Sequence, residues 1–301
     1  MIPPPATGSE SSGGWPIGQA PRVDLRLRTA ATRVLIVIAA LTALVPLAAQ
    51  RATPRRPASS ARAPVARAGT ERRVPFRVGE QLSYDITWSS FITATAATAT
   101  VSVREKRAAY GSLAYYLVAE GRPTPLVAML YSVYYKADSW LDVYTLLPLR
   151  ASVFSQEAGR RENKATLFER VRGTARYEEQ EGTRADSSSL KVPADTCDPL
   201  SAIFVLRTVP LAAGMRLSMP MVLDGVLYQV QLTVERREPL RTTRGTQTAW
   251  RIKPVVLDRG KPAASPRGML LWLTDDARRL PLKMQVEIPV GRFDLTMTAA
   301  K

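Results

Sequence analysis

Alternating apolar and polar residues recur in short segments from residue 74 to the C-terminus. In the first segment, Leu82, Tyr84 and Ile86 alternate with polar residues, which is the pattern of a strand with one buried face. Comparable segments cover residues 91–103, 115–119, 151–157, 165–171, 173–180, 249–256, 268–273, 282–288 and 293–297, with a hairpin over 219–235 around Asp224-Gly225. About eleven strands joined by short turns predict a mainly β fold, an antiparallel meander curled into a half-barrel or open barrel.

The alternation changes phase inside the second segment. Apolar side chains occupy even positions up to Ala96 and odd positions from Ala97. Because a change of phase moves side chains to the other face of a sheet, we expect a bulge or kink at Ala96/Ala97. A turn is also expected at Asp275-Asp276, between the strands over 268–273 and 282–288.

One segment has the signals of a helix. Asp198 is a good N-cap, Pro199 suits the first helical position, and Pro210 stops the helix. The residues between them are apolar nearly all round, so a short helix near 198–209 is expected to lie buried against the concave face of the sheet. A second short helix over residues 126–131 is left open.

Composition limits the chemistry that the chain can perform. It contains no histidine and a single cysteine, Cys197. The absence of histidine removes the commonest general base and the commonest zinc ligand, and a lone cysteine forms no internal disulfide. We therefore expect no enzymatic activity, no metal and no cofactor, and a structural role for Cys197.

An N-terminal apolar run predicts where the protein works. Residues 34–49 are almost entirely apolar and follow arginines at positions 22, 26, 28 and 33. A bilayer span needs about 20 apolar residues, so this shorter run over 22–49 predicts a secretory signal peptide, with retention as a signal anchor as the alternative. We expect residues 1–21 to be a disordered extension, residues 50–73 a disordered Arg/Ala/Pro linker, and residues 74–301 a single β-rich domain.

The chain carries a formal net charge of +16, and basic residues exceed acidic ones both before and after residue 75. Such a surplus favours contact with anionic lipid, lipopolysaccharide or nucleic acid. Because export removes most nucleic acid from reach, we expect no nucleic-acid partner, and we expect residues 50–73 to contact a membrane surface. The predicted location is the periplasm or cell envelope, with an inner-membrane anchor through 34–49 if the signal is retained.

Several motifs occur in an order that resembles the bacterial domain-of-unknown-function family 3108. They are residues 79–84 (GEQLSY) with Trp88, 135–142 (YKADSWLD) with Leu147-Pro148, 198–202 (DPLSA) with Leu206-Arg207, Asp224-Gly225, and 268–276 (GMLLWLTDD) with Leu280-Pro281. The likeness covers residues 74–301 and departs from the family in the second strand, where glycine is common and this chain has Ala and Thr over 94–100. The resemblance implies an exported, β-rich protein without an established activity. The layout is also similar to lipoprotein-carrier half-barrels in architecture alone.

Aromatic side chains are densest around residues 131–144 and form the first candidate site. These side chains and other aromatics of the predicted strands and helix could line an apolar ligand groove. The alternative is that they pack in an ordinary core. The candidate ligand-binding residues are Tyr84, Trp88, Tyr131, Tyr134, Tyr135, Trp140 and Phe204.

Charged residues form three further candidates. Arg236, Arg237, Arg241 and Arg244 fall in one predicted connection, as an anion-binding cluster or a solvated loop. Asp138 and Asp142 would lie about 13 Å apart on a strand, too far for a glycosidase pair. Glu80 is expected to bind a backbone group or an arginine.

These observations favour a non-catalytic envelope protein that binds a lipid or another amphiphile inside the curled sheet. The alternative is a scaffold or assembly factor whose sheet edge or face binds another envelope protein. A third hypothesis is a histidine-free glycan hydrolase, which needs two carboxylates within about 5–10 Å in a cleft.

Overall fold

A computed structural model describes residues 69–301 except 90–91, 158, 244, 265 and 290. The predicted extension (1–21), the signal (22–49) and nearly all of the linker (50–73) lie outside the described residues. Neither helix of the described part has the length and apolar character needed to cross a bilayer.

The described residues form fifteen strands, two α-helices and one 3-10 turn. In chain order they are β1 (Gln81–Trp88), β2 (Ile92–Ala109), β3 (Ser112–Pro123), α2 (Pro125–Leu130), β4 (Val133–Asp142), β5 (Pro148–Glu157), β6 (Arg160–Glu169), η2 (Arg170–Arg172), β7 (Thr174–Glu181), β8 (Arg184–Lys191), α3 (Pro199–Leu206), β9 (Arg216–Leu223), β10 (Val226–Thr242), β11 (Gly245–Asp258), β12 (Lys261–Pro262), β13 (Gly268–Thr274), β14 (Pro281–Ile288) and β15 (Gly291–Ala300).

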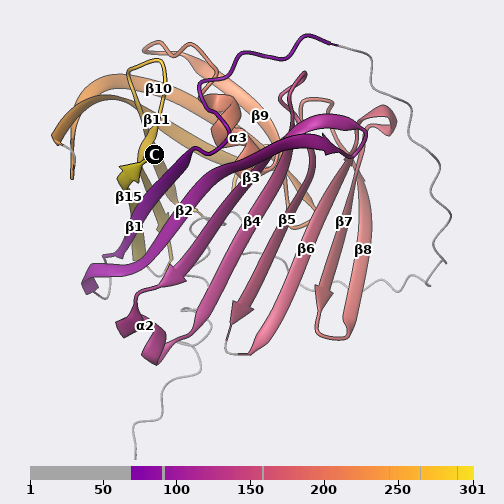
Figure 1. Ribbon diagram of the computed structural model, residues 1–301, viewed down its shortest axis with the longest axis horizontal. Coiled ribbons are helices and arrows are strands. Elements are labelled where there is room, and N and C mark those ends of the chain that lie inside the picture. Colours follow the sequence, from indigo (N-terminus) through magenta and orange to yellow (C-terminus); the bar gives the residue numbers. More distant parts are fainter. Residues whose placement is uncertain (1–68, 90–91, 158, 244, 265, 290) are drawn as a thin grey trace, which may run out of the picture.

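All the strands belong to one antiparallel sheet that curls around α3 (Figure 1). Its order is β8-β7-β6-β5-β4-β3-β2-β1-β15-β14-β13-β11-β10-β9, with β12 added beside β11. The first and last strands of the described residues meet in the middle of this order, because β1 pairs with β15. The predicted mainly β, meandering half-barrel with a buried helix is confirmed.

The strand count was predicted too low, at about eleven. The strands that were not predicted are β4, β8 and β12. Strand β8 carries the sequence RADSSSLK and is almost wholly exposed, so it has no apolar alternation, and its ladder with β7 holds it in the sheet. Strand β12 has two residues, which is too short to leave a pattern.

The bulge in β2 is confirmed at the predicted position. Ile86 of β1 faces Ala97, whereas the next residue, Thr87, faces Thr95, so Ala96 is the extra residue. Ala97 and Ala99 then lie buried on the core side of the sheet. The predicted turn at Asp275-Asp276 is also confirmed between β13 and β14.

The gap between the end strands β8 and β9 has no backbone ladder in the described residues, and two other contacts span it. The backbone of Cys197 pairs with β9, with its N–H donating to the Pro220 carbonyl and its carbonyl accepting from Val222. Val222 of β9 also packs against Phe168 and Ala175 of β6 and β7. The lone cysteine therefore lies in a segment that covers the edge of β9, and its thiol is buried.

Candidate functional site

Helix α3 is fixed at its start by a capping box. The Asp198 carboxylate accepts hydrogen bonds from the backbone of Leu200 and Ser201, at 2.9 and 3.1 Å, and the Ser201 hydroxyl accepts from the Asp198 N–H. The Ser139 hydroxyl of β4 donates to the same carboxylate at 2.7 Å. Burial raises the pKa of Asp198, against the effect of these hydrogen bonds. The helix ends at Leu206, before Pro210, and hydrogen-bonded turns continue to Val209.

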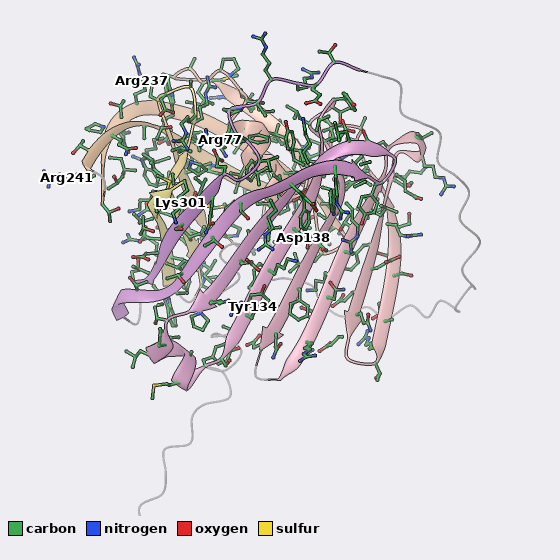
Figure 2. The ribbon with its side chains drawn as sticks, viewed as in Figure 1. Arg77, Tyr134, Asp138, Arg237, Arg241 and Lys301 are labelled. Atoms are coloured by element: carbon green, nitrogen blue, oxygen red, sulfur yellow. The ribbon has the colours of Figure 1, made fainter. Side chains whose placement is uncertain are left out.

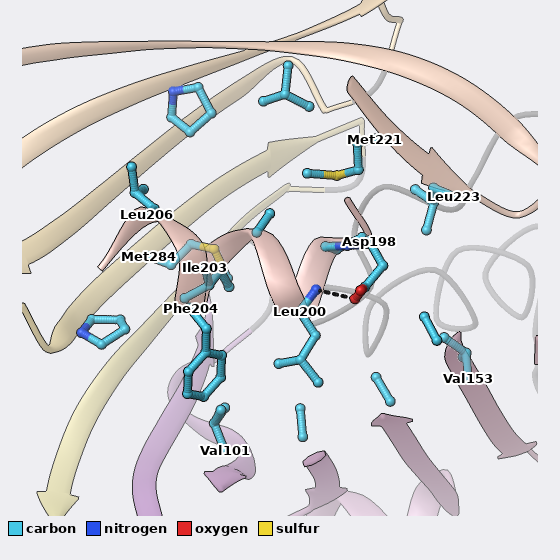
Figure 3. A pocket seen from close by; sticks show the side chains of 18 of the residues that line it. Val101, Val153, Asp198, Leu200, Ile203, Phe204, Leu206, Met221, Leu223 and Met284 are labelled. Atoms are coloured by element: carbon cyan, nitrogen blue, oxygen red, sulfur yellow. Dashed lines mark hydrogen bonds between the residues drawn. The ribbon is translucent and has the colours of Figure 1, made fainter. Parts of the chain in front are cut away.

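A largely apolar cavity of about 180 Å³, partly open to solvent, lies beside α3, between the helix and the concave face of the sheet (Figure 3). One wall is α3 itself, with Leu200, Ile203 and Phe204, and the others come from strands on every side. Apolar cavities of about this size bind small apolar molecules. This space is the candidate functional site.

The cavity exists because small side chains face the helix across adjacent strands. Val101 of β2 pairs with Ala119 of β3, Ala119 with Ala137 of β4, and Ala137 with Val153 of β5. All four line the cavity, and we call them the floor row. Because directly opposed residues share one face of a sheet, the row leaves a shallow trough beneath α3.

The wall opposite the floor row is rich in methionine. Met219 and Met221 of β9, Met269 of β13 and Met284 of β14 line the cavity. They are half of the eight methionines in the chain. Because methionine has three rotatable bonds and a polarisable sulfur, such a wall adapts to ligands of different shape.

At one end of the cavity, the next residues paired along the floor row are charged. Val153 pairs with Lys164 of β6, and Lys164 pairs with Glu179 of β7. The Lys164 ammonium lies 3.6 Å from Asp224 in the β9–β10 turn and 3.3 Å from Glu162. The Lys164–Asp224 pair therefore joins β6, near one end of the curled sheet, to the β9–β10 turn at the other. Lys164, Asp224 and Tyr177 line the cavity. We call Lys164, Asp224, Glu162, Glu179, Tyr135 and Tyr177 the polar end.

The groups of the polar end perturb one another's protonation. Burial raises the pKa of Asp224 to about 6, although Lys164 opposes this shift. Burial lowers the pKa of Lys164, but Asp224, Glu162 and Glu179 together outweigh it, so the net shift is upward. Burial, and then the charge of Asp224, raise the pKa of the Tyr135 and Tyr177 hydroxyls. Residues in a cleft whose pKa values are shifted by burial and by neighbouring charges are candidates for a functional site.

The raised pKa of Asp224 predicts a pH-dependent stability. Its folded pKa of about 6 exceeds the value of about 3.9 expected in the unfolded chain, so its stabilising contribution is present below pH 4 and is lost as the pH rises through 6. Asp224→Asn preserves the size of the side chain and tolerates the positive φ of 48°. We expect the free energy of unfolding of the wild type, relative to this variant, to fall by about 2–3 kcal/mol between pH 4 and pH 7.5. Urea unfolding at both pH values measures it; a constant difference, or one that grows with pH, would contradict the assignment.

Three of the predicted aromatic residues meet at the cavity. Tyr84 of β1, Tyr135 of β4 and Phe204 of α3 all line it and are almost fully buried. The Tyr84 hydroxyl donates to the Pro281 carbonyl at 2.9 Å, so it is already satisfied. Among the three, Tyr135 therefore brings a hydroxyl without a hydrogen-bond partner in the described residues.

The other four predicted aromatics do not line the cavity. Trp140 stacks on Tyr116 with ring centroids 4.5 Å apart, and Tyr134 donates its hydroxyl to Glu120. Because successive side chains of a strand point to opposite faces, Tyr134 lies on the face of β4 opposite to Tyr135. Trp88 stacks on Phe293, and Tyr131 follows α2.

The predicted arginine connection is wrong, because three of its four arginines belong to the long strand β10. Arg236, Arg237 and Arg241 lie opposite Arg251, Trp250 and Thr246 of β11, so the segment continues the sheet instead of forming a loop. Arg236 pairs with Glu238, and Arg237 with Asp275. Figure 2 shows Arg237 and Arg241 on this hairpin, away from Tyr134 on β4. Arg244 lies outside the described residues.

The remaining predicted carboxylates have structural partners. Asp142 accepts hydrogen bonds from the backbone of Tyr144 and Thr145, so its predicted turn role is confirmed. Asp138 accepts from the Ser152 hydroxyl at 2.8 Å. In the part of the chain that the structure describes, no group of three or more His, Cys, Asp or Glu residues is arranged to hold a metal ion.

Sequence reasoning missed the floor row and, apart from Tyr135, the polar end. The floor row is hidden because alanine and valine are ordinary strand residues, and their significance depends on pairing across four strands. Lys164 and Asp224 are distant in sequence, and curling of the sheet brings them together. The one available signal was Lys164 itself, a charged residue immediately before the predicted strand over 165–171.

Comparisons with known proteins give one family match and several similar solved structures. The model of the family described as protein of unknown function DUF3108 matches residues 83–298. The structure is similar to a beta-barrel-like protein of domain of unknown function DUF1849 from Brucella abortus, with TM-score 0.51, 11% identity and coverage of 74% of this chain and 97% of that chain. It is also similar to a Bacteroides fragilis protein described as exported with a YmcC-like fold, with TM-score 0.29, 9% identity and coverage of 77% and 100%. No curated protein sequence matches the chain significantly.

Proposed function

The chain belongs to the DUF3108 family of proteins of unknown function, and we propose that it is an exported envelope protein that binds a lipid or another amphiphile without transforming it. The observation that carries this proposal is the apolar cavity between α3 and the concave face of the sheet. Concave, mainly apolar sites with a few convergent polar groups are the usual form of small-molecule sites. The floor row and the four methionines give such a site room and adaptability.

Export is proposed from the N-terminal sequence. The apolar run over residues 34–49 follows four arginines and is shorter than a typical bilayer span. A binder of apolar molecules in the envelope would use such a signal. The basic stretch 50–73 would then lie near an anionic membrane surface.

A binding role is favoured over hydrolysis by the partners of the cavity carboxylates. Asp198 caps α3 and accepts from Ser139, Asp138 accepts from Ser152, and Asp224 pairs with Lys164. A carboxylate committed to capping is a poor general acid or base, since its hydrogen bonds must break before it takes up a proton. We propose that these carboxylates shape the cavity and orient its ligand, and that no covalent bond is made or broken there.

Binding is also favoured over the assembly-factor alternative. That alternative would use an edge or a face of the sheet, and one such edge is the outer side of β8, which ends the sheet. Strand β8 is polar and begins and ends with the basic residues Arg184 and Lys191, and charged residues on an edge strand hinder its pairing with another chain. The residues of β8 are therefore those of a protected sheet edge and not those of a strand that docks another protein.

Filling the floor row tests the proposal. We expect Ala137→Leu to reduce binding of a fluorescent long-chain fatty-acyl probe by at least about tenfold, because the added side chain occupies the trough. The packing strain should lower the free energy of unfolding by no more than about 1–3 kcal/mol. Fluorescence titration of the purified protein measures the affinity, and urea unfolding checks that the variant folds.

Two further variants make this result interpretable. Ala119→Leu fills the neighbouring position of the floor row and is expected to act in the same way. Ala185→Leu adds the same side chain to an exposed position of β8 and is expected to leave binding unchanged. Equal binding by the wild type and both floor-row variants would show that the probe does not enter the cavity.

A further inference from the structure

We propose that the polar end selects an amphiphile whose head group is uncharged and carries a hydroxyl, such as a monoacylglycerol or a long-chain alcohol. This inference rests on the proposed function and adds the chemical class of the head group. The polar end would orient the ligand so that its apolar tail lies along the floor row and its head group contacts Tyr135 and Asp224.

The first observation is a pair of buried polar atoms. Neither the Tyr135 hydroxyl nor the Asp224 Oδ2 atom has a hydrogen-bond partner in the described residues. Tyr135 is only 4% exposed, and both residues line the cavity. Buried polar groups are nearly always hydrogen-bonded, so two such atoms in one cavity wall mark a place where a ligand group binds.

The second observation is the direction of the hydrogen bonds that these atoms can make. An ionised carboxylate only accepts, whereas a tyrosine hydroxyl both donates and accepts. A ligand hydroxyl satisfies both partners, since it donates to Asp224 Oδ2 and accepts from Tyr135. A head group with only acceptors, such as a carboxylate or a phosphate ester, leaves Asp224 without a donor.

The third observation is the distribution of charge. Asp224, Glu162 and Glu179 surround Lys164 and raise its pKa, so its ammonium is already engaged by carboxylates. An anionic head group would be repelled by these carboxylates, which outnumber the ammonium. A cationic head group would have to compete with Lys164 for the same carboxylates. An uncharged hydroxyl meets neither the repulsion nor the competition.

The position of the polar end agrees with this orientation. Tyr135 lies two residues before Ala137 on the same face of β4, and Lys164 lies directly opposite Val153. The floor row is therefore continuous with the polar end. An amphiphile whose tail lies over Ala119 and Ala137 would place its head group beside β6 and the β9–β10 turn.

The experiment compares three ligands with the same tail. We expect the full-length protein to bind 1-monooleoylglycerol at least about tenfold more tightly than oleate or oleylamine, measured by displacement of the fluorescent fatty-acyl probe. Tyr135→Phe removes only the hydroxyl, and it should weaken monooleoylglycerol binding by about five- to tenfold while leaving oleate unchanged. Tyr116→Phe, which removes a hydroxyl on the face occupied by Trp140, is the matched control and should change neither affinity.

The outcomes separate this inference from the proposed function. Equal affinities for the three ligands, or an equal loss for all of them in Tyr135→Phe, would overturn head-group selection and leave cavity binding intact. A protein that is folded but binds none of the ligands would overturn both. Asp224→Asn provides a second variant and should also reduce the preference for monooleoylglycerol over oleate.

Discussion

Replacing Glu80 with glutamine is expected to lower the free energy of unfolding by about 3–5 kcal/mol, because it leaves the Arg207 guanidinium buried without its counter-charge. Arg207 has no exposed surface, and Glu80 is 3% exposed. The guanidinium donates to both carboxylate oxygens, at 2.6 and 3.1 Å, and also to the Arg278 carbonyl. The pair therefore ties the start of β1 to the end of α3 and to the β13–β14 turn, which holds the helix over the cavity.

Two comparisons isolate the effect of burial. Glu105→Gln breaks the exposed pair with Arg107 and should cost less than about 1 kcal/mol. The double variant Glu80→Leu/Arg207→Met removes both charges and should recover part of the loss, since apolar replacement of a buried pair is often neutral. Urea unfolding monitored by tryptophan fluorescence measures all three. A loss below about 1 kcal/mol for Glu80→Gln would mean that Arg207 is not held as described.

Gly225→Ala should destabilise the protein by about 2–4 kcal/mol, the second large effect that we expect. Gly225 has a φ of +71°, which is unfavourable for alanine, and a Cβ atom there would lie 2.9 Å from the Tyr177 ring. The β9–β10 turn would have to move away from β7 to relieve this contact. Because Asp224 precedes this glycine, the substitution should also weaken ligand binding at the polar end.

The control for this variant is Gly182→Ala in the turn between β7 and β8. Gly182 has a comparable φ of +56°, but nothing lies within 4 Å of a Cβ atom placed on it. It should therefore show only the backbone cost of about 1–2 kcal/mol. If the two variants lose equal stability in urea unfolding, the contact between the turn and Tyr177 contributes nothing.

Local patterns predicted much of the fold. Alternation located most strands, the phase change located the bulge at Ala96, and the signals at Asp198 and Pro199 located α3. These features depend on neighbouring residues, so a single sequence contains them. Strand β8 was missed because its side chains are polar and its pairing with β7 is made by the backbone.

The candidate site was less accessible to sequence reasoning. Strand alternation implies that Tyr134 and Tyr135 point to opposite faces, but which face becomes concave depends on how the whole sheet curls. The same curl brings Asp224 to Lys164 and the β9–β10 turn to Tyr177. No local pattern encodes these contacts, because they join the two ends of the sheet.

Native mass spectrometry of the protein purified without detergent tests the central claim most directly, namely that the cavity beneath α3 holds an amphiphile. The proposal predicts a fraction of the wild type with one added mass of an uncharged, hydroxyl-bearing lipid, which is lost in Ala137→Leu and retained in Ala185→Leu. A wild-type protein that is folded, carries no added mass, and stays bare after incubation with monooleoylglycerol would contradict the claim.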